Sequence, residues 1–301
     1  MTYLVSFKQI ATLLTMILLG VVGRRKGLIG EACSKSMVNL LIYFTLPALI
    51  LHSTNLPTSH ALSTGVLAAV LGLVIRFFSL LVGQAIGKVA RWEAKEQAIF
   101  TFQMTFGNAG FIGLPICYAL YGEQGSFLGA LFNLSHEFLF WTLGIWLVSK
   151  KSNGDWRNFL NPPGIASVLG LILFGAGIRL PEFFSSLFGQ LGAATTPLAM
   201  LLVGSQLRFA AASRRQWLFL VTLCLFRLLI VPVGVFYLLS QFALPKILIQ
   251  VATIITAMPA STMLTVIAAQ VGSDAELASA TTLVTTVCAA FTIPLIIALV
   301  S

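Results

Sequence analysis

Apolar stretches long enough to cross a bilayer follow one another along almost the whole 301-residue chain. A membrane helix needs roughly 20 predominantly apolar residues in succession. With 58% hydrophobic and 9% charged residues, the composition excludes an ordinary soluble domain, in which about 25% of residues are charged. The pattern predicts an all-α polytopic membrane protein with ten spans, at residues 4–22, 34–52, 61–88, 97–121, 125–149, 164–179, 186–207, 214–241, 246–270 and 275–300.

Two of these stretches contain residues that suit an intact helix poorly. Asn108–Pro115 reads Asn-Ala-Gly-Phe-Ile-Gly-Leu-Pro, and Met258–Thr262 reads Met-Pro-Ala-Ser-Thr. Glycine and proline destabilise helix interiors, and backbone groups freed inside a bilayer must face protein, water or a bound solute. We therefore expect helix breaks at Gly113, Pro115 and Pro259. Interrupted spans at matching positions of two halves indicate a transporter's binding site.

The positive charges lie mostly on one side of the predicted topology. With the N-terminus outside, thirteen of the 18 Lys and Arg residues fall in cytoplasmic joints and three fall outside, while Arg76 and Arg227 lie within spans. The positive-inside rule therefore favours a multi-pass protein of the plasma membrane (the bacterial inner membrane) with both termini outside. The net charge of +9 then requires no nucleic-acid partner, and the composition makes the lipid bilayer the expected surroundings.

The two halves of the chain resemble each other in register. Four features recur at separations of 150 to 152 positions: Pro47 and Pro197, Arg76 and Arg227, Gly122 and Gly272, and Gly107-Asn108 and Pro259-Ala260. Features that recur in the same order indicate an internal duplication. Because each half has five spans, the second half must run inverted through the membrane. We predict a first five-helix repeat at 1–149, a cytoplasmic connector at 150–163 and a second, inverted repeat at 164–301.

The predicted breaks offer groups that suit a carboxylate. Half-helix N-termini present free N–H groups and a positive dipole end to an anion. Asn108 adds an amide donor, and Ser261 and Thr262 add hydroxyl groups. Purely structural roles stay open. Asn108 could cap a helix, and the hydroxyl groups of Ser261 and Thr262 could donate hydrogen bonds to carbonyl groups of their own helix. The expected substrate-binding residues at the breaks are Thr105, Gly107, Asn108, Ala109, Gly110, Pro259, Ala260, Ser261 and Thr262, with Gln103 one turn earlier.

His136 and Glu137 are neighbouring ionisable residues near the middle of the predicted fifth span. An ionisable residue inside a membrane span is a functional candidate. We expect His136 to contribute to the substrate site and Glu137 to couple transport to protons. Alternatively, the two pair with each other, or with Arg76 or Arg227, to hold the bundle together. The two arginines are interpreted either as residues with equivalent structural roles in the two halves or as part of an anion path.

No enzyme or metal motif is evident. The cysteines, which have no metal-ligand spacing and are expected to be core residues, are Cys33, Cys117, Cys224 and Cys288. The sequence contains no HExxH, GxSxG or phosphate-loop motif and no nucleotide-binding domain. We predict a protein that is not an enzyme and holds no cofactor or metal. Any pumping would draw on a partner ATPase or on a substrate or ion gradient, with Na⁺ or H⁺ as the coupling ion.

These motifs resemble the auxin efflux carrier family of bacterial and plant membrane transporters, within the bile acid/sodium symporter-like fold. Gly107-Asn108 followed by Gly113-Leu114-Pro115 is similar to the Pro-Asn-x4-Gly-Ile-Pro segment of the plant carriers' fourth span. Further segments similar to the family are Ala257-Met258-Pro259 with Ala268-Ala269, Asn161-Pro162, and Pro197-Leu198-Ala199 with Gly204. Gly107 stands where the plant proteins have proline, and the large central cytoplasmic loop of many plant members is missing, so that loop's regulation is not implied.

The resemblance implies a scaffold of spans 1, 2, 6 and 7 that also forms a homodimer. It implies a transport domain of spans 3–5 and 8–10 that moves like an elevator, with spans 4 and 9 crossing at their breaks. It also implies organic acid anions as substrates. The residue matching Asn108 would contact the carboxylate, and span 5, which carries His136 and Glu137, would line the same pocket.

We therefore expect a secondary transporter of small organic acid anions, coupled to protons or sodium. Three alternatives stay open. The first is a carrier of amino acids or other solutes on the same fold. The second is a membrane sensor that binds a solute without moving it. The third is an intramembrane enzyme, for which His136-Glu137 would need a nucleophile nearby.

Overall fold

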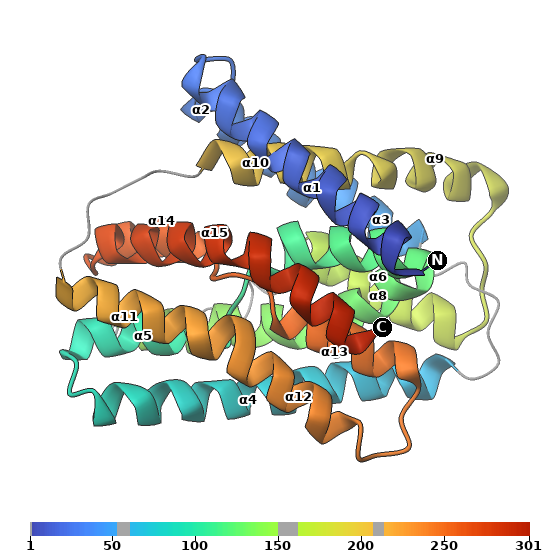
Figure 1. Cartoon of the computed structure of the whole chain (residues 1–301). Helices are drawn as coiled ribbons and strands as arrows, with labels where there is room; N and C mark the ends of the chain where they lie inside the picture. Colours follow the sequence, from blue (N-terminus) through green and yellow to red (C-terminus); the bar gives the residue numbers. More distant parts are fainter. Residues whose placement is uncertain (1, 53–60, 150–161, 207–213) are drawn as a thin grey trace. The chain divides into compact units, whose positions relative to one another are not determined.

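The computed structural model describes residues 2–52, 61–149, 162–206 and 214–301. Within these residues all the regular elements are helices (Figure 1). The β pairing among them is an isolated bridge between Gly107 and Ala260. The prediction of an all-α protein is therefore confirmed for the described part of the chain. Most of the predicted connector, 150–161, lies outside the described residues.

Regular α-helices alternate with short π-helical segments, which are labelled η. In chain order the elements are α1 (Thr2–Arg25), α2 (Glu31–Leu40), η1 (Leu41–Thr45), α3 (Leu46–His52), α4 (Ala61–Val89), α5 (Ala94–Thr105), η3 (Ala109–Gly113), α6 (Leu114–Leu139), η4 (Phe140–Gly144), α7 (Ile145–Ser149), α8 (Pro162–Gly175), α9 (Glu182–Ala193), α10 (Thr195–Gln206), α11 (Arg214–Leu225), η6 (Phe226–Ile230), α12 (Val231–Leu239), α13 (Lys246–Thr256), α14 (Met263–Gln270) and α15 (Ala275–Val300).

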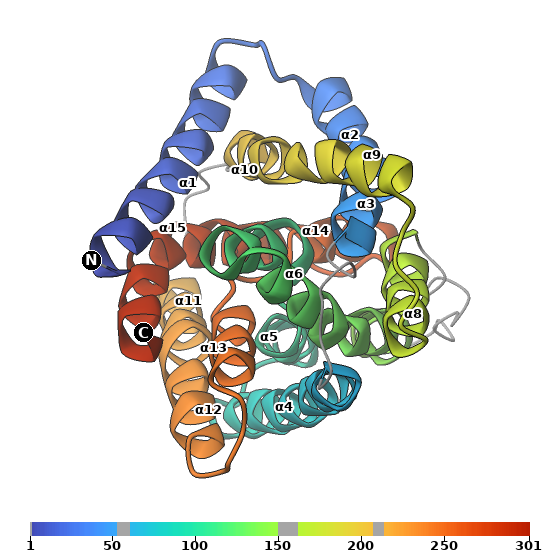
Figure 2. The ribbon, with the colours of Figure 1, turned by 90° about the vertical axis from the view of Figure 1, so that its right-hand side faces the viewer.

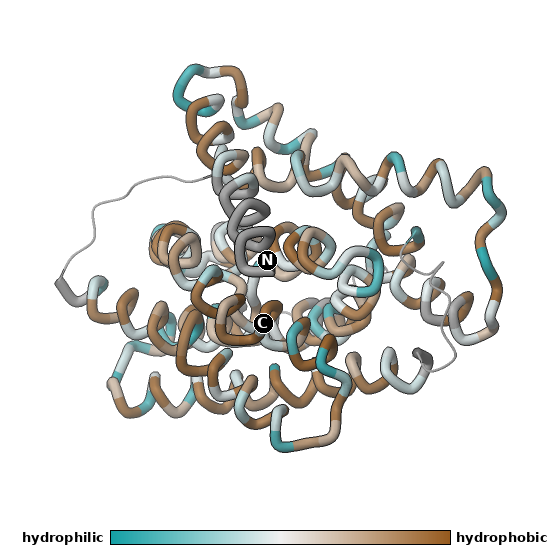
Figure 3. The backbone as a smooth tube through the Cα atoms, turned by 45° about the vertical axis from the view of Figure 1, so that its right-hand side comes forward, coloured by the Kyte–Doolittle hydropathy of each residue, from teal (hydrophilic) through white to brown (hydrophobic). Residues whose placement is uncertain are grey.

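Several of these helices are long and apolar enough to cross a membrane. Among the described residues, five such segments are Glu31–His52, Ser63–Val89, Glu182–Ser205, Gln216–Leu239 and Ala275–Val300. Figure 3 shows hydrophobic residues along most of the helices and hydrophilic residues at many of the turns. Large apolar side chains also face outward, since Phe291 is 73% and Leu218 67% exposed. Such surfaces are expected where the surrounding medium is lipid rather than water.

Three π-helical segments each end two residues before a proline. These prolines are Pro47 after η1, Pro115 after η3 and Pro232 after η6. Proline has no N–H to donate, and its ring would clash with the carbonyl group four residues earlier. A local π-helical turn relieves both problems, so proline is tolerated within membrane helices. Pro115 thus widens its helix, and the actual interruption lies before Gly113 and Pro115, at residues 106–108.

Packing divides the chain into two compact units. The first comprises Met1–Ala69, Gly110–Leu134 and Leu160–Leu207. In it, α1 packs against α10, and α3 packs against α8 and α9 (Figure 2). Gly20 and Gly204 permit the close approach of α1 and α10. A Cβ atom on Gly20 would fall onto the carbonyl oxygen of Leu201, and one on Gly204 would fall onto that of Ile17. Small residues commonly allow such close packing between membrane helices.

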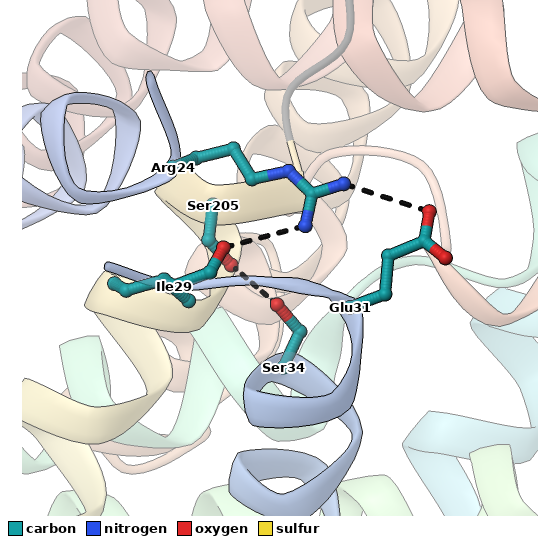
Figure 4. A network of polar contacts seen from close by, with 5 residues as sticks. All are labelled: Arg24, Ile29, Glu31, Ser34 and Ser205. Atoms are coloured by element: carbon teal, nitrogen blue, oxygen red, sulfur yellow. Dashed lines mark hydrogen bonds and ion pairs between the residues drawn. The ribbon is translucent and has the colours of Figure 1, made fainter. Parts of the chain in front are cut away.

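Polar contacts hold the turn between α1 and α2 (Figure 4). Arg24 donates from Nη1 to the carbonyl oxygen of Ile29 over 3.3 Å, and its Nη2 lies 3.5 Å from Glu31 Oε1. The hydroxyl groups of Ser34 and Ser205 lie 3.2 Å apart and connect α2 with α10. Because the Glu31 side chain is 75% exposed, its ion pair contributes little stability. The contacts instead orient α2 at the end of α1.

Among the described residues, four glycines have positive φ angles, and they fall at corresponding positions of the two predicted halves. Gly27 (φ 75°) follows α1, and Gly177 (φ 67°) follows α8. Gly122 (φ 63°) lies at a kink within α6, and Gly272 (φ 69°) follows α14. Each pair is separated by 150 positions. Residues with a side chain rarely adopt this conformation. Corresponding positions of the two halves therefore share a left-handed backbone conformation that favours glycine.

The second unit comprises Val70–Ala109, Ser135–Phe159 and Arg208–Ser301. In it, α15 packs against α11, α13 and α14 (Figure 2). The ring of Trp92 lies 4.5 Å from that of Phe100 and 4.7 Å from that of Phe219, between ring centroids. These aromatic contacts tie α5 and α11 together at the turn that precedes α5.

Candidate functional site

Two helix interruptions meet in the second unit. Helix α5 ends at Thr105 and α13 ends at Thr256, and helical structure resumes at Ala109 and Met263. Between these points Gly107 forms an antiparallel bridge with Ala260. The main-chain N–H of Asn108 donates to the carbonyl oxygen of Pro259 over 2.8 Å. The interruptions therefore supply hydrogen-bond partners to each other.

Gln103 of α5 binds the main chain of the second interruption. Its side chain is fully buried. Its Oε1 accepts from the N–H of Ser261 over 2.8 Å, and its Nε2 donates to Thr281 Oγ1 over 2.9 Å. The same Nε2 lies 3.4 Å from the carbonyl oxygen of Ser261. Unpaired main-chain groups are costly when buried, so Gln103 stabilises the broken conformation itself.

Helix α15 completes this network with threonine hydroxyl groups. Thr282 Oγ1 donates to the carbonyl oxygen of Ser261 over 3.1 Å. Thr285 Oγ1 accepts from the N–H of Ala260 over 3.0 Å. These threonines were not among the residues predicted from the sequence. A signal existed in the apolar last span, where threonines occur as Thr281-Thr282 and Thr285-Thr286, four residues apart on one helix face.

Arg227 connects both interruptions from a third helix. It lies in η6 and is 5% exposed. Its Nη1 donates to the carbonyl oxygen of Met104 over 2.6 Å, and its Nε donates to that of Met258 over 3.0 Å. A Cβ atom on Gly107 would fall onto Nη2 of the same guanidinium group. Glycine at position 107 therefore leaves the space that Arg227 occupies.

Arg76, the sequence counterpart of Arg227, has different surroundings. It lies in the regular helix α4 and is also 5% exposed. Its Nη1 donates to the carbonyl oxygen of Gly72 on its own helix, over 3.1 Å, and to Ser135 Oγ, over 3.2 Å. The two arginines match in sequence, but these hydrogen bonds differ. Those of Arg227 reach carbonyl groups at both interruptions, whereas these two of Arg76 reach Gly72 and Ser135.

The remaining candidates at the interruptions differ in their surroundings. Thr105 Oγ1 donates within its own helix, to the carbonyl oxygen of Thr101 over 2.7 Å. The Asn108 side chain is 5% exposed. Ala109 begins η3, and a Cβ atom added to Gly110 would meet no atom within 4 Å. Thr262 stands directly before α14 without a side-chain cap bond. Buried donors and small residues thus lie together along these segments.

His136 contacts the first interruption through the aromatic ring of Phe106. Its ring stacks on Phe140 with 5.5 Å between centroids and meets Phe106, at the same separation, edge to face. Phe106 directly precedes Gly107 in the interrupted segment. Glu137 lies within α6, but its side chain is outside the described residues. Its predicted coupling role therefore stays a prediction.

A second polar site lies in the first unit, around His52 at the end of α3. His52 Nδ1 lies 3.0 Å from the carbonyl oxygen of Ser185, and its Nε2 lies 3.0 Å from Glu123 Oε1. A hollow of about 570 Å³ adjoins the imidazole and is also lined by Arg179 and Glu182. Sequence spacing did not indicate this cluster because its residues come from three separated segments.

Comparisons with known proteins agree on one class. The family described as membrane transport protein matches the chain twice, over residues 5–155 and 154–297. An uncharacterized transporter of Methanocaldococcus jannaschii is 25% identical over 296 residues, which cover 94% of this chain and 95% of the relative. An uncharacterized transporter of Methanothermobacter thermautotrophicus is 24% identical over 310 residues, which cover 98% of each chain.

Proposed function

Because the chain belongs to the membrane transport protein family, also called the auxin efflux carrier family, we propose that it is a secondary transporter of small organic acid anions. The observation that carries this proposal is the contact between two interrupted apolar helices, through Gly107 and Ala260. Interrupted helices that meet in this way form the substrate sites of alternating-access carriers.

The charge around the interruptions favours an anion. Neither segment, 106–108 or 257–262, contains an acidic residue. Helical structure begins directly after each of them, so helix N-termini with positive dipole ends lie at the site. The guanidinium group of Arg227 offsets the negative C-terminal ends of α5 and α13 nearby. A carboxylate would meet donors here and no fixed negative charge from either segment.

The proposed architecture is ten spans in two inverted five-helix repeats. Helical segments lie over all ten predicted ranges, the family matches each half separately, and the positive-φ glycines recur 150 positions apart. We place spans 1, 2, 6 and 7 in a scaffold that forms a homodimer and spans 3–5 and 8–10 in a mobile transport domain. The charge distribution supports both termini outside the plasma membrane.

In the proposed mechanism the carboxylate binds Asn108 and the neighbouring helix N-termini. Thr105, Ser261, Thr262 and His136 line the same site, and Glu137 serves as a coupling group. The transport domain then shifts against the scaffold and exposes the anion to the other side. Neither step requires covalent chemistry, which agrees with a carrier rather than an enzyme.

A ligand panel on the purified protein tests the substrate class. We expect carboxylates to raise the melting temperature, whereas amines and neutral sugars leave it unchanged. A ligand at ten times its dissociation constant stabilises the folded state by about 1.4 kcal/mol. We expect Asn108→Ala to abolish this stabilisation and Gln241→Ala, which changes an exposed amide at the end of α12, to retain it.

The same panel separates the alternatives. Stabilisation by amino acids alone would favour an amino-acid carrier on the same fold. Stabilisation by carboxylates without flux into proteoliposomes would favour a sensor. Retained binding in Asn108→Ala would refute the assignment of this residue to the carboxylate site.

A further inference from the structure

The carbonyl groups at the ends of both interrupted helices already bind a cation that belongs to the chain. Met104 lies in the last turn of α5, and Met258 lies just beyond the end of α13. Their carbonyl oxygens accept hydrogen bonds from Nη1 and Nε of Arg227, over 2.6 and 3.0 Å. Helix C-terminal ends carry a partial negative charge, so the guanidinium group neutralises two such ends together.

In many carriers with interrupted spans, a small cation binds at the C-terminal ends of the half-helices. Freed carbonyl groups and the C-terminal ends of half-helices coordinate the coupling Na⁺. A guanidinium group satisfies carbonyl oxygens through N–H donors and carries the same single positive charge. It also stays protonated in proteins and cannot dissociate. Arg227 therefore supplies the electrostatic equivalent of one bound monovalent cation.

Other oxygen atoms of the second interruption are also bonded to donors of the chain. The carbonyl oxygen of Pro259 accepts from the N–H of Asn108. The carbonyl oxygen of Ser261 accepts from Thr282 Oγ1 and lies within hydrogen-bond distance of Gln103 Nε2. A sodium ion needs several oxygen ligands that point at one place. The donors around these oxygens do not fit a sodium site.

The local backbone holds the guanidinium group in this position. Pro232 follows the π-helical segment η6, which carries Arg227, and π-helical turns often occur at functional sites. On the opposite side, a Cβ atom at Gly107 would fall onto Nη2 and lie 3.0 Å from Cζ. Gly107 and Arg227 are thus a matched pair.

Among the described residues, main-chain groups balance the charge of Arg227. The ion pairs of the described residues, Arg24 with Glu31 and His52 with Glu123, do not include it. A buried charge requires compensation, and the two carbonyl groups and helix ends provide it. We infer that Arg227 takes the place of a coupling sodium ion, so that the protein binds its anion independently of sodium. The consequence for transport rests on the proposed function, whereas the position of the cation does not.

The wild-type protein provides the first test without any substrate. Its melting temperature is measured in NaCl, KCl and choline chloride at equal ionic strength. We expect the same value in the three salts, because the internal cation is always present. A saturable stabilisation by Na⁺ alone would overturn the inference.

Two matched variants extend this test. Arg227→Gln removes the buried cation from the interrupted segments, and Arg76→Gln removes an equally buried one that donates to Gly72 and Ser135. We expect stability to depend on the monovalent cation only in Arg227→Gln, since only there are the carbonyl groups of Met104 and Met258 released. Equal cation dependence in the two variants, including none in either, would contradict the inference.

Binding of the anion provides an independent measurement. We expect each stabilising carboxylate to have the same Kd in NaCl and in choline chloride, whereas coupling to sodium would change it by about 5- to 150-fold. Sodium-dependent binding would refute the inference and leave the anion carrier standing. A panel without any stabilising carboxylate would instead count against the proposed function, while the salt series still decides the role of Arg227.

Discussion

At the scale of single residues, position 107 shows how a missing side chain shapes the candidate site. Gly107 pairs with Ala260 and leaves room for the guanidinium group of Arg227. A side chain here would displace a buried charge from two main-chain acceptors. The carbonyl oxygen of Pro259 lies 3.1 Å from the same point, so the backbone also limits any rearrangement.

We expect Gly107→Ala to lower stability, because its Cβ atom would occupy the place of Arg227 Nη2. Overpacking of this kind costs about 1–3 kcal/mol. Gly110→Ala is the matched control, since its Cβ atom would meet nothing within 4 Å, and a change within about 0.5 kcal/mol is expected. Thermal unfolding of both variants checks the prediction, and equal losses would contradict it.

At the scale of elements, proline and glycine have separable effects on the helices. Proline at positions 47, 115 and 232 follows π-helical segments and leaves the helix continuous. The true interruptions depend on partners from other elements, as when Gln103 binds the main chain of Ser261. The glycines and the proline of span 4 therefore indicate the right region for its interruption, but a proline by itself does not define where the helix ends.

Close packing of α1 against α10 leads to a prediction at this scale. A Cβ atom at Gly204 would fall onto the carbonyl oxygen of Ile17, and backbone cannot move aside without shifting the helix. We expect Gly204→Ala to lower the melting temperature. Gly234→Ala in α12 makes the same change where nothing lies within 4 Å, and should be neutral or stabilising because alanine favours helix by up to about 1 kcal/mol. A stable Gly204→Ala protein would show that the two helices do not require this contact.

At the scale of the whole molecule, the recurring features support a duplicated chain whose halves have since diverged. Gly27 and Gly177 share a positive φ at corresponding positions, and the family matches each half. Arg76 and Arg227 also correspond, yet their contacts differ. A duplication conserves the positions of spans and turns, while the chemistry of one half can change independently.

The orientation of the chain in the membrane is testable at the same scale. Because most Lys and Arg residues fall in the predicted cytoplasmic joints, we expect the C-terminus outside. Alkaline phosphatase, which is active only outside the cytoplasm, should be active when fused after Ser301. It should be inactive when inserted within 150–161, the predicted cytoplasmic connector. The opposite activities would reverse the proposed topology.

The sequence by itself determined the all-α membrane class, the regions of the two interruptions and the family. These properties follow from local composition and from motifs that lie close together along the chain. Only the tertiary structure decided that Gly107 pairs with Ala260 and that Arg227 binds both Met104 and Met258. The physical reason is separation, since Arg227 and Met104 are 123 positions apart, and no local spacing specifies which distant carbonyl groups a buried guanidinium group will reach.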